Sequence, residues 1–203
     1  LMPRMKEMGI VVSVDVTAPD GDPNWSLCYD RNVIGDVADY LVFMAYDQYG
    51  TFSTKPGTTA GFNWVETSLK KIIEYDEVDA EKIILGLPFY TRQWTIASDG
   101  TIKNRSVVTM INTKIPNNVE KQWDDQLKQY YIEYKSGKNT IKMWIEDGTS
   151  IKEKVSLVSK YNLGGTSAWR KDMETSNIWT IIREGLENKI YFSVRVATSL
   201  EEL

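Results

Sequence analysis

Four short hydrophobic runs recur along the chain, separated by segments whose apolar residues have a helical spacing. Such runs are typical of strands that are covered on both faces, as in a parallel sheet. The segments between them predict amphipathic helices, and the alternation favours βαβ units and an α/β fold. The runs span residues 10–16, 40–45, 83–89 and 164–169, and the helical positions are Val65, Leu69, Ile72 and Ile73, then Ile151, Val155 and Val158, then Ile178, Ile182 and Leu186.

Two helix boundaries are predicted from single residues. Residues 2–8 have the pattern of a helix end that stops at Gly9. Ser150 and Glu153 have the spacing of a capping box, which predicts a helix over residues 149–160.

Residues 91–147 do not share the alternation of strand and helix. Residues 130–134 and 140–145 are strand-like and flank the turn sequence Ser136-Gly137-Lys138-Asn139, which predicts a β-hairpin. We expect an α+β insertion here. An eight-fold βα barrel has about 250 residues, so half of a TIM (β/α)8 barrel plus this insertion roughly accounts for the 203 residues of the chain. The expected parts are residues 1–90 and 148–203 for the half-barrel and 91–147 for the insertion.

Composition narrows the possible chemistry. Apolar residues make up 42% of the chain, enough for a packed core, and the formal net charge is −4. We therefore expect no nucleic acid as a partner. The chain has no histidine, which excludes serine–histidine and cysteine–histidine mechanisms within it. We expect no metal and no cofactor, so catalysis would depend on carboxylates, tyrosines or groups outside the chain.

Neither covalent cross-links nor membrane segments are indicated by the sequence. The single cysteine, Cys28, cannot form an internal disulfide. No apolar run approaches the roughly 18 residues that a membrane span needs, and no signal-peptide pattern is visible. The chain opens at Leu1 with a helix already under way, so we expect a fragment of a longer protein.

Chemically useful side chains follow the second hydrophobic run. In βα barrels, functional groups lie at the carboxyl ends of the strands. Met44 and Tyr46 are two residues apart and share one face of a strand, and Asp47 comes next. A phenol and a carboxylate at a barrel rim can hold a polar substrate group. The alternative is an aromatic layer that fills the barrel, with Asp47 capping the following loop, and the spacing does not decide between the two.

Other candidate residues have a competing structural explanation. Trp169 ends the last run, where an indole can stack under a sugar ring, but for a lone tryptophan core packing is favoured. Glu146 and Asp147 can reach a site from the insertion, yet an acid pair at a helix N-terminus is slightly favoured. The acidic stretch at residues 76–81 is best explained as a solvated loop.

Four motifs in order resemble glycoside hydrolase family 18, the family of chitinases and N-acetylglucosaminidases. An insertion between the last two barrel strands is also a family feature. The stretch at residues 13–19, SVDVTAP, is most similar to the bacterial spore and cell-envelope branch. The motifs are Met44-Ala45-Tyr46-Asp47, Ile84-Leu85-Gly86-Leu87-Pro88-Phe89-Tyr90, Trp144-Ile145-Glu146-Asp147 and Leu163-Gly164-Gly165-Thr166-Ser167-Ala168-Trp169.

This resemblance implies a barrel strand order and a substrate-assisted mechanism. Residues 1–90 would supply strands five to seven, and residues 148–203 the last strand. The N-acetyl oxygen of the substrate attacks its own anomeric carbon while a glutamic acid protonates the leaving oxygen. Tyr46 and Asp47 are then expected to orient the N-acetyl group, and Trp169 to form the floor under that sugar. The other positions that the resemblance assigns to substrate binding are Met44, Tyr90, Arg92 and Glu146.

The catalytic acid of the family is the main departure. It belongs to an Asp-x-x-Asp-x-Asp-x-Glu motif on the fourth barrel strand, and this spacing does not occur in the chain. Asp76, Asp79 and Glu81 come nearest but are wrongly spaced. We therefore expect the chain alone to be inactive and its parent to hydrolyse β-1,4-linked N-acetylglucosamine polymers, chitin or peptidoglycan.

The sequence leaves two alternatives to an enzyme fragment open. The chain can act as a binding module, like family members that lost the acid and only hold sugars, or it can be a structural fragment without function. A half-barrel has unpaired strand edges at residues 10–16 and 164–169, which invite association with a second copy. The resemblance implies an extracellular, cell-wall or spore location.

Overall fold

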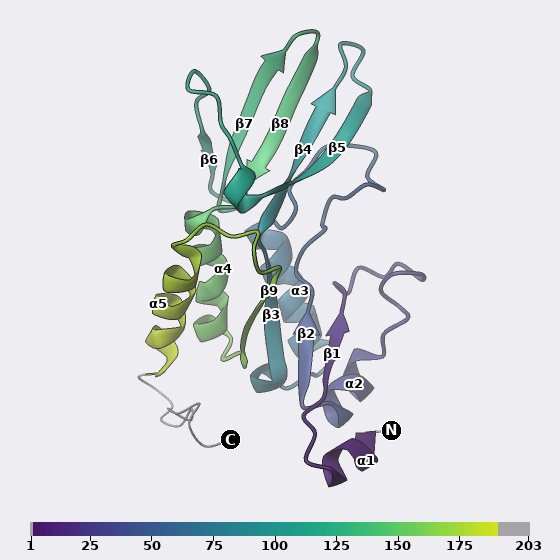
Figure 1. The fold of residues 1–203 in the computed structure, drawn as a ribbon. Helices are drawn as coiled ribbons and strands as arrows, with labels where there is room; N and C mark the ends of the chain where they lie inside the picture. The colour runs from purple at the N-terminus through teal and green to yellow at the C-terminus, as the bar shows by residue number, and fades with distance from the viewer. Residues whose placement is uncertain (1, 191–203) are drawn as a thin grey trace.

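The molecule consists of two sheets that follow one another along its length, with the α-helices gathered around the lower one in Figure 1. The computed structural model describes residues 2–190. The lower part contains α1 (Met2–Glu7), β1 (Ser13–Val16), α2 (Arg31–Val37), β2 (Tyr40–Phe43), α3 (Phe62–Glu74), the 3-10 turn η1 (Ala80–Lys82), β3 (Ile83–Pro88), α4 (Gly148–Lys160), β9 (Gly165–Trp169) and α5 (Ile178–Ile190). The upper part contains β4 (Tyr90–Ile96), β5 (Ile102–Thr109), the 3-10 turn η2 (Met110–Asn112), β6 (Gln122–Asp124), β7 (Gln129–Ser136) and β8 (Asn139–Ile145).

The lower sheet is the predicted parallel one. Its four strands have the order β1-β2-β3-β9 and every neighbouring pair is parallel. Each hydrophobic run of the sequence supplies one strand, and a helix follows or precedes each, so the α/β class is confirmed. Among residues 2–190 the sheet does not close on itself, and β1 and β9 form its two edges.

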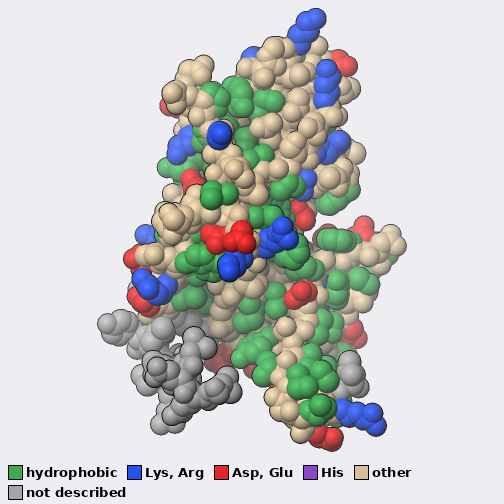
Figure 2. Space-filling view, viewed as in Figure 1, with side chains coloured by type: hydrophobic (Ala, Val, Ile, Leu, Met, Phe, Trp, Pro, Cys, Tyr) green, Lys and Arg blue, Asp and Glu red, His purple; other side chains and the backbone are tan. Residues whose placement is uncertain are grey.

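The two faces of this sheet are buried to different degrees. Leu41, Phe43, Leu85 and Leu87 have no exposed surface and pack in one cluster with residues from α3 and α4. The residues between them, such as Val42 and Ile84, stay half-buried. In Figure 2 hydrophobic side chains reach the surface over this sheet. The runs are therefore as apolar as strands buried on both faces, although the described residues fully cover only one.

The first strand is shorter than predicted. It begins at Ser13 rather than at residue 10, and Ile10 and Val11 are exposed. The N–H of Val12 donates instead to Asp39 Oδ2 at 2.8 Å, and its carbonyl oxygen accepts from the N–H of Asp39 at 3.0 Å. The bond from Val12 to the Asp39 side chain replaces a backbone hydrogen bond between strands. Regular pairing with β2 therefore starts at the next residue, Ser13.

The upper sheet is entirely antiparallel, in the order β5-β4-β8-β7-β6. The predicted hairpin is confirmed as β7 and β8, whose turn contains Gly137 at φ 59°. The expectation of an α+β insertion is wrong in its helical part, because residues 91–147 hold strands and one 3-10 turn but no α-helix. A second small core, formed by Ile132, Ile141, Met143 and Ile145, stabilises this sheet.

The end of α1 agrees with the sequence prediction, whereas the start of α4 differs from it. α1 stops before Gly9, whose φ is 70°, as predicted. The capping box of α4 is formed by Asp147 and Ser150, not by Ser150 and Glu153. Asp147 Oδ1 accepts from the N–H groups of Thr149 and Ser150, and Ser150 Oγ accepts from the N–H of Asp147. The helix thus begins one residue earlier than expected. Among residues 2–190, no helix is both long and apolar enough to cross a bilayer.

Candidate functional site

The carboxyl end of β2 and the start of β4 meet at Asp47. This residue follows β2 with φ 59°, a left-handed conformation that aspartate tolerates better than most residues. Tyr90 Oη donates to Asp47 Oδ1 at 2.9 Å, and Arg92 Nη2 donates to the same oxygen at 3.2 Å. Tyr90 and Arg92 are two residues apart on β4 and therefore share one face. The structure thus brings together three of the predicted site residues.

Both hydrogen bonds reach the same carboxylate oxygen. No donor among the described residues bonds to Asp47 Oδ2, and the side chain is 36% exposed. Arg92 is 5% exposed and also donates to the carbonyl oxygen of Arg105 at 3.3 Å. The buried guanidinium and the buried phenol hold one oxygen of the carboxylate in place, while the other oxygen accepts no hydrogen bond from the described residues.

Tyr46 extends this cluster. Its ring lies 6.2 Å from that of Tyr90 in an edge-on arrangement. Burial, followed by the negative charges of Asp15 and Asp47, raises the pKa of the Tyr46 phenol to about 12. Burial and the contact with Asp47 also raise the pKa of Tyr90 above its usual value. Both phenols are therefore neutral hydrogen-bond donors at physiological pH.

Met44 and Trp169 lie at the same end of the parallel sheet. Met44 is half-buried, and its Cα would lie 3.3 Å from a Cβ added to Gly86 on the neighbouring strand. Only glycine fits there, because the same added carbon would stand 2.7 Å from the carbonyl oxygen of Phe43. Trp169 pairs with Pro88, and β3 separates it from β2.

The indole of Trp169 is available for contact. The residue is 52% exposed, while its carbonyl oxygen accepts from the N–H of Phe89 at 2.8 Å. A cis peptide bond joins it to Arg170. The structure therefore favours an exposed ring over the core packing that a lone tryptophan would suggest, although it does not place Trp169 in contact with Asp47.

Glu146, which the family resemblance assigns to substrate binding, is buried among the described residues. Its side chain has no exposed surface and pairs with Lys154 Nζ at 3.0 and 3.1 Å. Ser150 Oγ donates to it at 2.8 Å and Gln129 Nε2 at 2.5 Å. Burial raises the pKa of the Glu146 carboxyl, and Lys154 and Ser150 oppose that rise. Its contacts within residues 2–190 are all internal, and they join α4 to the upper sheet.

The bonds of Glu146 continue towards the loop after Asp47. Gln129 Oε1 accepts from Thr58 Oγ1 at 2.5 Å. The segment around Thr58 returns to the start of its own loop, where the N–H of Gln48 donates to the carbonyl oxygen of Thr59 at 2.9 Å. The buried ion pair thereby ties α4, the upper sheet and the loop after β2 to one another. The sequence analysis did not identify Lys154 or Gln129. The only signal was that Lys154 occupies an otherwise apolar helix position; Gln129 had none.

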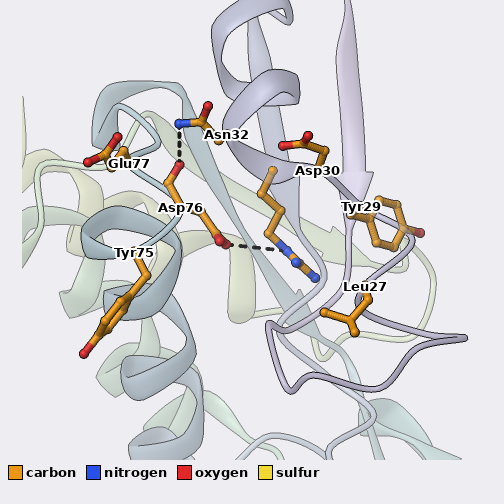
Figure 3. Close-up of a pocket in the computed structure, with 8 residues that line it drawn as sticks. Leu27, Tyr29, Asp30, Asn32, Tyr75, Asp76 and Glu77 are labelled. Atoms are coloured by element: carbon orange, nitrogen blue, oxygen red, sulfur yellow. Dashed lines mark hydrogen bonds and ion pairs between the residues drawn. The ribbon is translucent and has the colours of Figure 1, made fainter.

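A separate hollow of about 600 Å³ lies between α2 and the end of α3. Arg31 Nε lies 4.0 Å from Asp76 Oδ2. Asn32 Nδ2 donates to the carbonyl oxygen of Asp76 at 3.1 Å, as Figure 3 shows. Arg31 Nη2 also donates to the carbonyl oxygen of Thr17 at 2.9 Å, so it holds the loop after β1. Burial raises the pKa of Asp76, and the charge of Arg31 opposes that rise. The acidic stretch at residues 76–81 is thus partly a structural contact rather than only a solvated loop.

We predict strong coupling between Glu146 and Lys154. Removing one partner of a fully buried ion pair costs about 3–5 kcal/mol of stability, so Lys154→Met should lower the free energy of unfolding by about that amount. Adding Glu146→Gln to this variant removes the carboxylate charge that Lys154→Met leaves unpaired. The side-chain oxygen of glutamine can still accept from Gln129 Nε2. Urea denaturation of the double variant should show about 1–3 kcal/mol of coupling.

The matched control is Lys160→Met. Lys160 also pairs with a glutamate, Glu66, but its side chain is 57% exposed. Exposed pairs contribute at most about 1 kcal/mol. Additive effects at Glu146 and Lys154, or a loss at Lys160 as large as at Lys154, would contradict the structural role of the buried pair.

We also predict an alkaline shift in the titration of Tyr46. Its pKa of about 12 in the folded chain exceeds the value of about 10 expected when unfolded. Ionisation therefore favours unfolding, and the contribution of Tyr46 to stability is lost as the pH rises from about 10 through about 12. Tyrosinate absorbance of the wild type minus Tyr46→Phe should stay low at pH values near 11 while circular dichroism remains native. A full tyrosinate signal there would contradict the buried phenol.

Comparison with known proteins identifies the family. Residues 4–174 match the family model described as glycosyl hydrolases family 18. The uncharacterized glycosylase YvbX of Bacillus subtilis is 28% identical over 184 residues, which cover 89% of this chain and 52% of that protein. The cortical fragment-lytic enzyme of Bacillus subtilis is 26% identical over 166 residues, covering 79% of this chain and 37% of the relative. The chain thus spans about half the length, or less, of these relatives.

Solved structures agree in fold. A chitinase from Chromobacterium violaceum superposes with a TM-score of 0.81 at 27% identity, covering 91% of this chain and 58% of the chitinase. The spore cortex-lytic enzyme SleL of Bacillus megaterium shares the fold at 22% identity, with a TM-score of 0.77 and coverage of 91% and 43%. The open parallel sheet and its helices are accordingly a partial barrel of the family type, and the chain belongs to glycosyl hydrolase family 18.

Proposed function

We propose that this chain forms one side of the saccharide cleft of a glycosidase that hydrolyses β-1,4-linked N-acetylglucosamine polymers. The observation that carries this proposal is the Asp47 carboxylate, fixed on one oxygen by Tyr90 and Arg92 and free on the other. Tyr46 lies beside it as a neutral phenol. The arrangement presents one acceptor and one donor, which are the two groups that an acetamido substituent can bind.

The geometry suits a substrate-assisted reaction. When the acetamido oxygen attacks the anomeric carbon, the amide gains positive charge. A carboxylate whose position is already fixed stabilises that charge without reorganising. Asp47 Oδ2 accepts from the acetamido N–H in this proposal, and Tyr46 orients the acetamido oxygen. Arg92 and Tyr90 act on the substrate through Asp47, and Met44 packs beneath the cluster.

The exposed indole of Trp169 completes the sugar site in this proposal. Axial C–H groups of a pyranose stack on an aromatic face, and half of this residue is exposed. Trp169 lies across β3 from β2 at the same end of the sheet. The two-strand separation of Trp169 from β2 suits one sugar ring over the strand ends, with its acetamido group towards Asp47.

The proton donor is outside these residues in our proposal. The acidic motif expected from the family resemblance is absent from the chain, and the carboxylates near the cluster are Asp15 and Asp47. The half-covered face of the parallel sheet and its open edges support completion of the barrel by further strands, either from a longer parent chain or from a second copy. Chitin and peptidoglycan both remain candidate polymers, because the relatives' names include chitinases and cortex-lytic enzymes.

The missing motif also favours a second function, a non-catalytic module that only holds N-acetylglucosamine polymers. Both functions use the same site. They differ in whether a proton donor reaches the glycosidic oxygen, so an assay that measures binding and product formation together separates them.

The test is to mix the 203-residue chain with tetra-N-acetylchitotetraose, measuring heat of binding and reaction products. We expect binding without hydrolysis, and at least a tenfold loss of affinity in Asp47→Asn and in Trp169→Ala. Asparagine tolerates the left-handed backbone at position 47, so the first variant removes the charge and replaces one oxygen acceptor with an N–H donor without straining the backbone. Sedimentation in the same buffer reports whether one or two copies are present.

Matched controls are Asp99→Asn and Tyr75→Ala. Asp99 lies in an exposed turn of the upper sheet, and Tyr75 is 79% exposed at the end of α3. Both should leave affinity unchanged. Product formation by this chain would overturn the missing-donor proposal, and unchanged affinity in Asp47→Asn and Trp169→Ala would overturn the site.

A further inference from the structure

A hollow lined by aromatic rings lies on the upper sheet, about 490 Å³ in volume, and Asp47 is not among its lining residues. Its centre is a row across three neighbouring strands, because Trp144 on β8 stands opposite Tyr131 on β7, which stands opposite Gln122 on β6. Residues in direct register share one face of a sheet. The rings of Tyr131 and Trp144 are 4.9 Å apart and inclined by 43°, so they form one continuous aromatic surface.

These rings are not needed to fill the core. On β8 the neighbours of Trp144 point to the opposite face, where Met143 and Ile145 are almost fully buried in the small core of the sheet. Trp144 and Tyr131 remain half-buried. Tyr131 Oη donates to Glu133 Oε2 at 2.5 Å, which fixes the ring on the surface. Partly exposed aromatic rings held in fixed positions are typical of binding surfaces.

Polar groups line the rim on the β6 side. Gln122 is exposed, and Asp124 and Asp125 follow it at the end of the strand. Trp123 Nε1 donates to Asp125 Oδ1 at 3.3 Å, so the rim carboxylate is oriented. Aromatic faces bind the C–H faces of a pyranose, and the carboxylate and amide oxygens accept from its hydroxyl groups. Lys128 Nζ pairs with Asp125 Oδ1 at 2.8 Å. Among the described residues Asp124 has no such cation, so its charge disfavours an anionic ligand.

The hollow is separate from the Asp47 cluster. Gly57 accepts from Trp94 Nε1 on β4 at 2.8 Å, and Thr58 bonds to Gln129 on β7. Since β8 lies between β4 and β7, this segment crosses β8 on the face that carries Trp144. The crossing separates Tyr90 and Arg92 on β4 from the row of rings that ends at β6.

We propose that Trp144, Tyr131 and Gln122, with the Trp123–Asp125 rim, form a secondary binding subsite for neutral N-acetylglucosamine oligosaccharides. The ligand class rests on the proposed function, whereas the aromatic hollow does not. A glycan held here is outside the cluster that would carry the chemistry, so the subsite retains the polymer on the protein rather than reacting with it.

The test records indole N–H resonances of the chain by NMR while tetra-N-acetylchitotetraose is added. Each indole signal is assigned from its Trp→Phe variant. The titration is repeated in the double variant Asp47→Asn, Trp169→Ala, which disables the proposed cleft. We expect the Trp144 signal to keep shifting there, and Trp144→Ala or Tyr131→Ala to weaken that remaining binding at least fivefold.

Controls separate packing effects from sugar contacts. Tyr131→Phe keeps the aromatic surface and should retain most of the binding. Trp179→Ala removes a half-exposed indole on α5 and should have no effect on the Trp144 shift. A Trp144 signal that stays still while the wild-type cleft binds would overturn the subsite and leave the proposed function intact. No binding to either place would overturn the proposed function and the ligand class together.

Discussion

The contact of Asp47 with Tyr90 and Arg92 is the interaction on which the rest of the proposed site depends. It joins the loop after β2 to the first strand of the upper sheet, two parts of the chain that are more than 40 residues apart. Because β3 ends at Pro88 and β4 begins at Tyr90, the upper sheet rises directly from the end of the lower one. This close connection places a phenol and a guanidinium over the end of the neighbouring strand. The two hydrogen bonds hold the side chain of Asp47, whose backbone is in the left-handed conformation.

The second junction between the two sheets has a different character. Where β8 returns to the barrel part, Glu146 and Lys154 form a buried ion pair that also binds Ser150 and Gln129. Such a pair contributes little net stability compared with apolar packing, but its loss on one side is costly. Its value is therefore geometric, since it fixes α4 against the upper sheet and, through Thr58, the loop that follows Asp47. Asp47 is half-buried and is bonded through one carboxylate oxygen, whereas Glu146 is fully buried and bonded through both.

Much of the architecture could be predicted because hydrophobic periodicity reports burial directly. The runs at residues 40–45 and 83–89 became β2 and β3, and the turn at Ser136–Asn139 became a hairpin. The errors arose where a side chain competed with the backbone. Asp39 binds Val12 and shortens β1, and Asp147 caps α4 ahead of Ser150. The burial of Glu146 was not predicted, because its partners Lys154 and Gln129 are polar and lie 8 and 17 residues away in sequence. The one local signal is the place of Lys154 at an otherwise apolar helix position. The row of Gln122, Tyr131 and Trp144 depends on strand register, which spacing within one strand does not give.

The central claim is that Asp47 is held in a fixed position by its partners on β4, and a double-mutant cycle measures this directly. Asp47→Asn, Arg92→Gln and the double variant are compared by urea denaturation. If the contact is made as described, the coupling free energy is about 1–3 kcal/mol, since the two residues share one hydrogen-bonded pair. Effects that add within about 0.5 kcal/mol would mean that the two side chains do not act on each other. The carboxylate would then have no fixed position from which to orient a sugar.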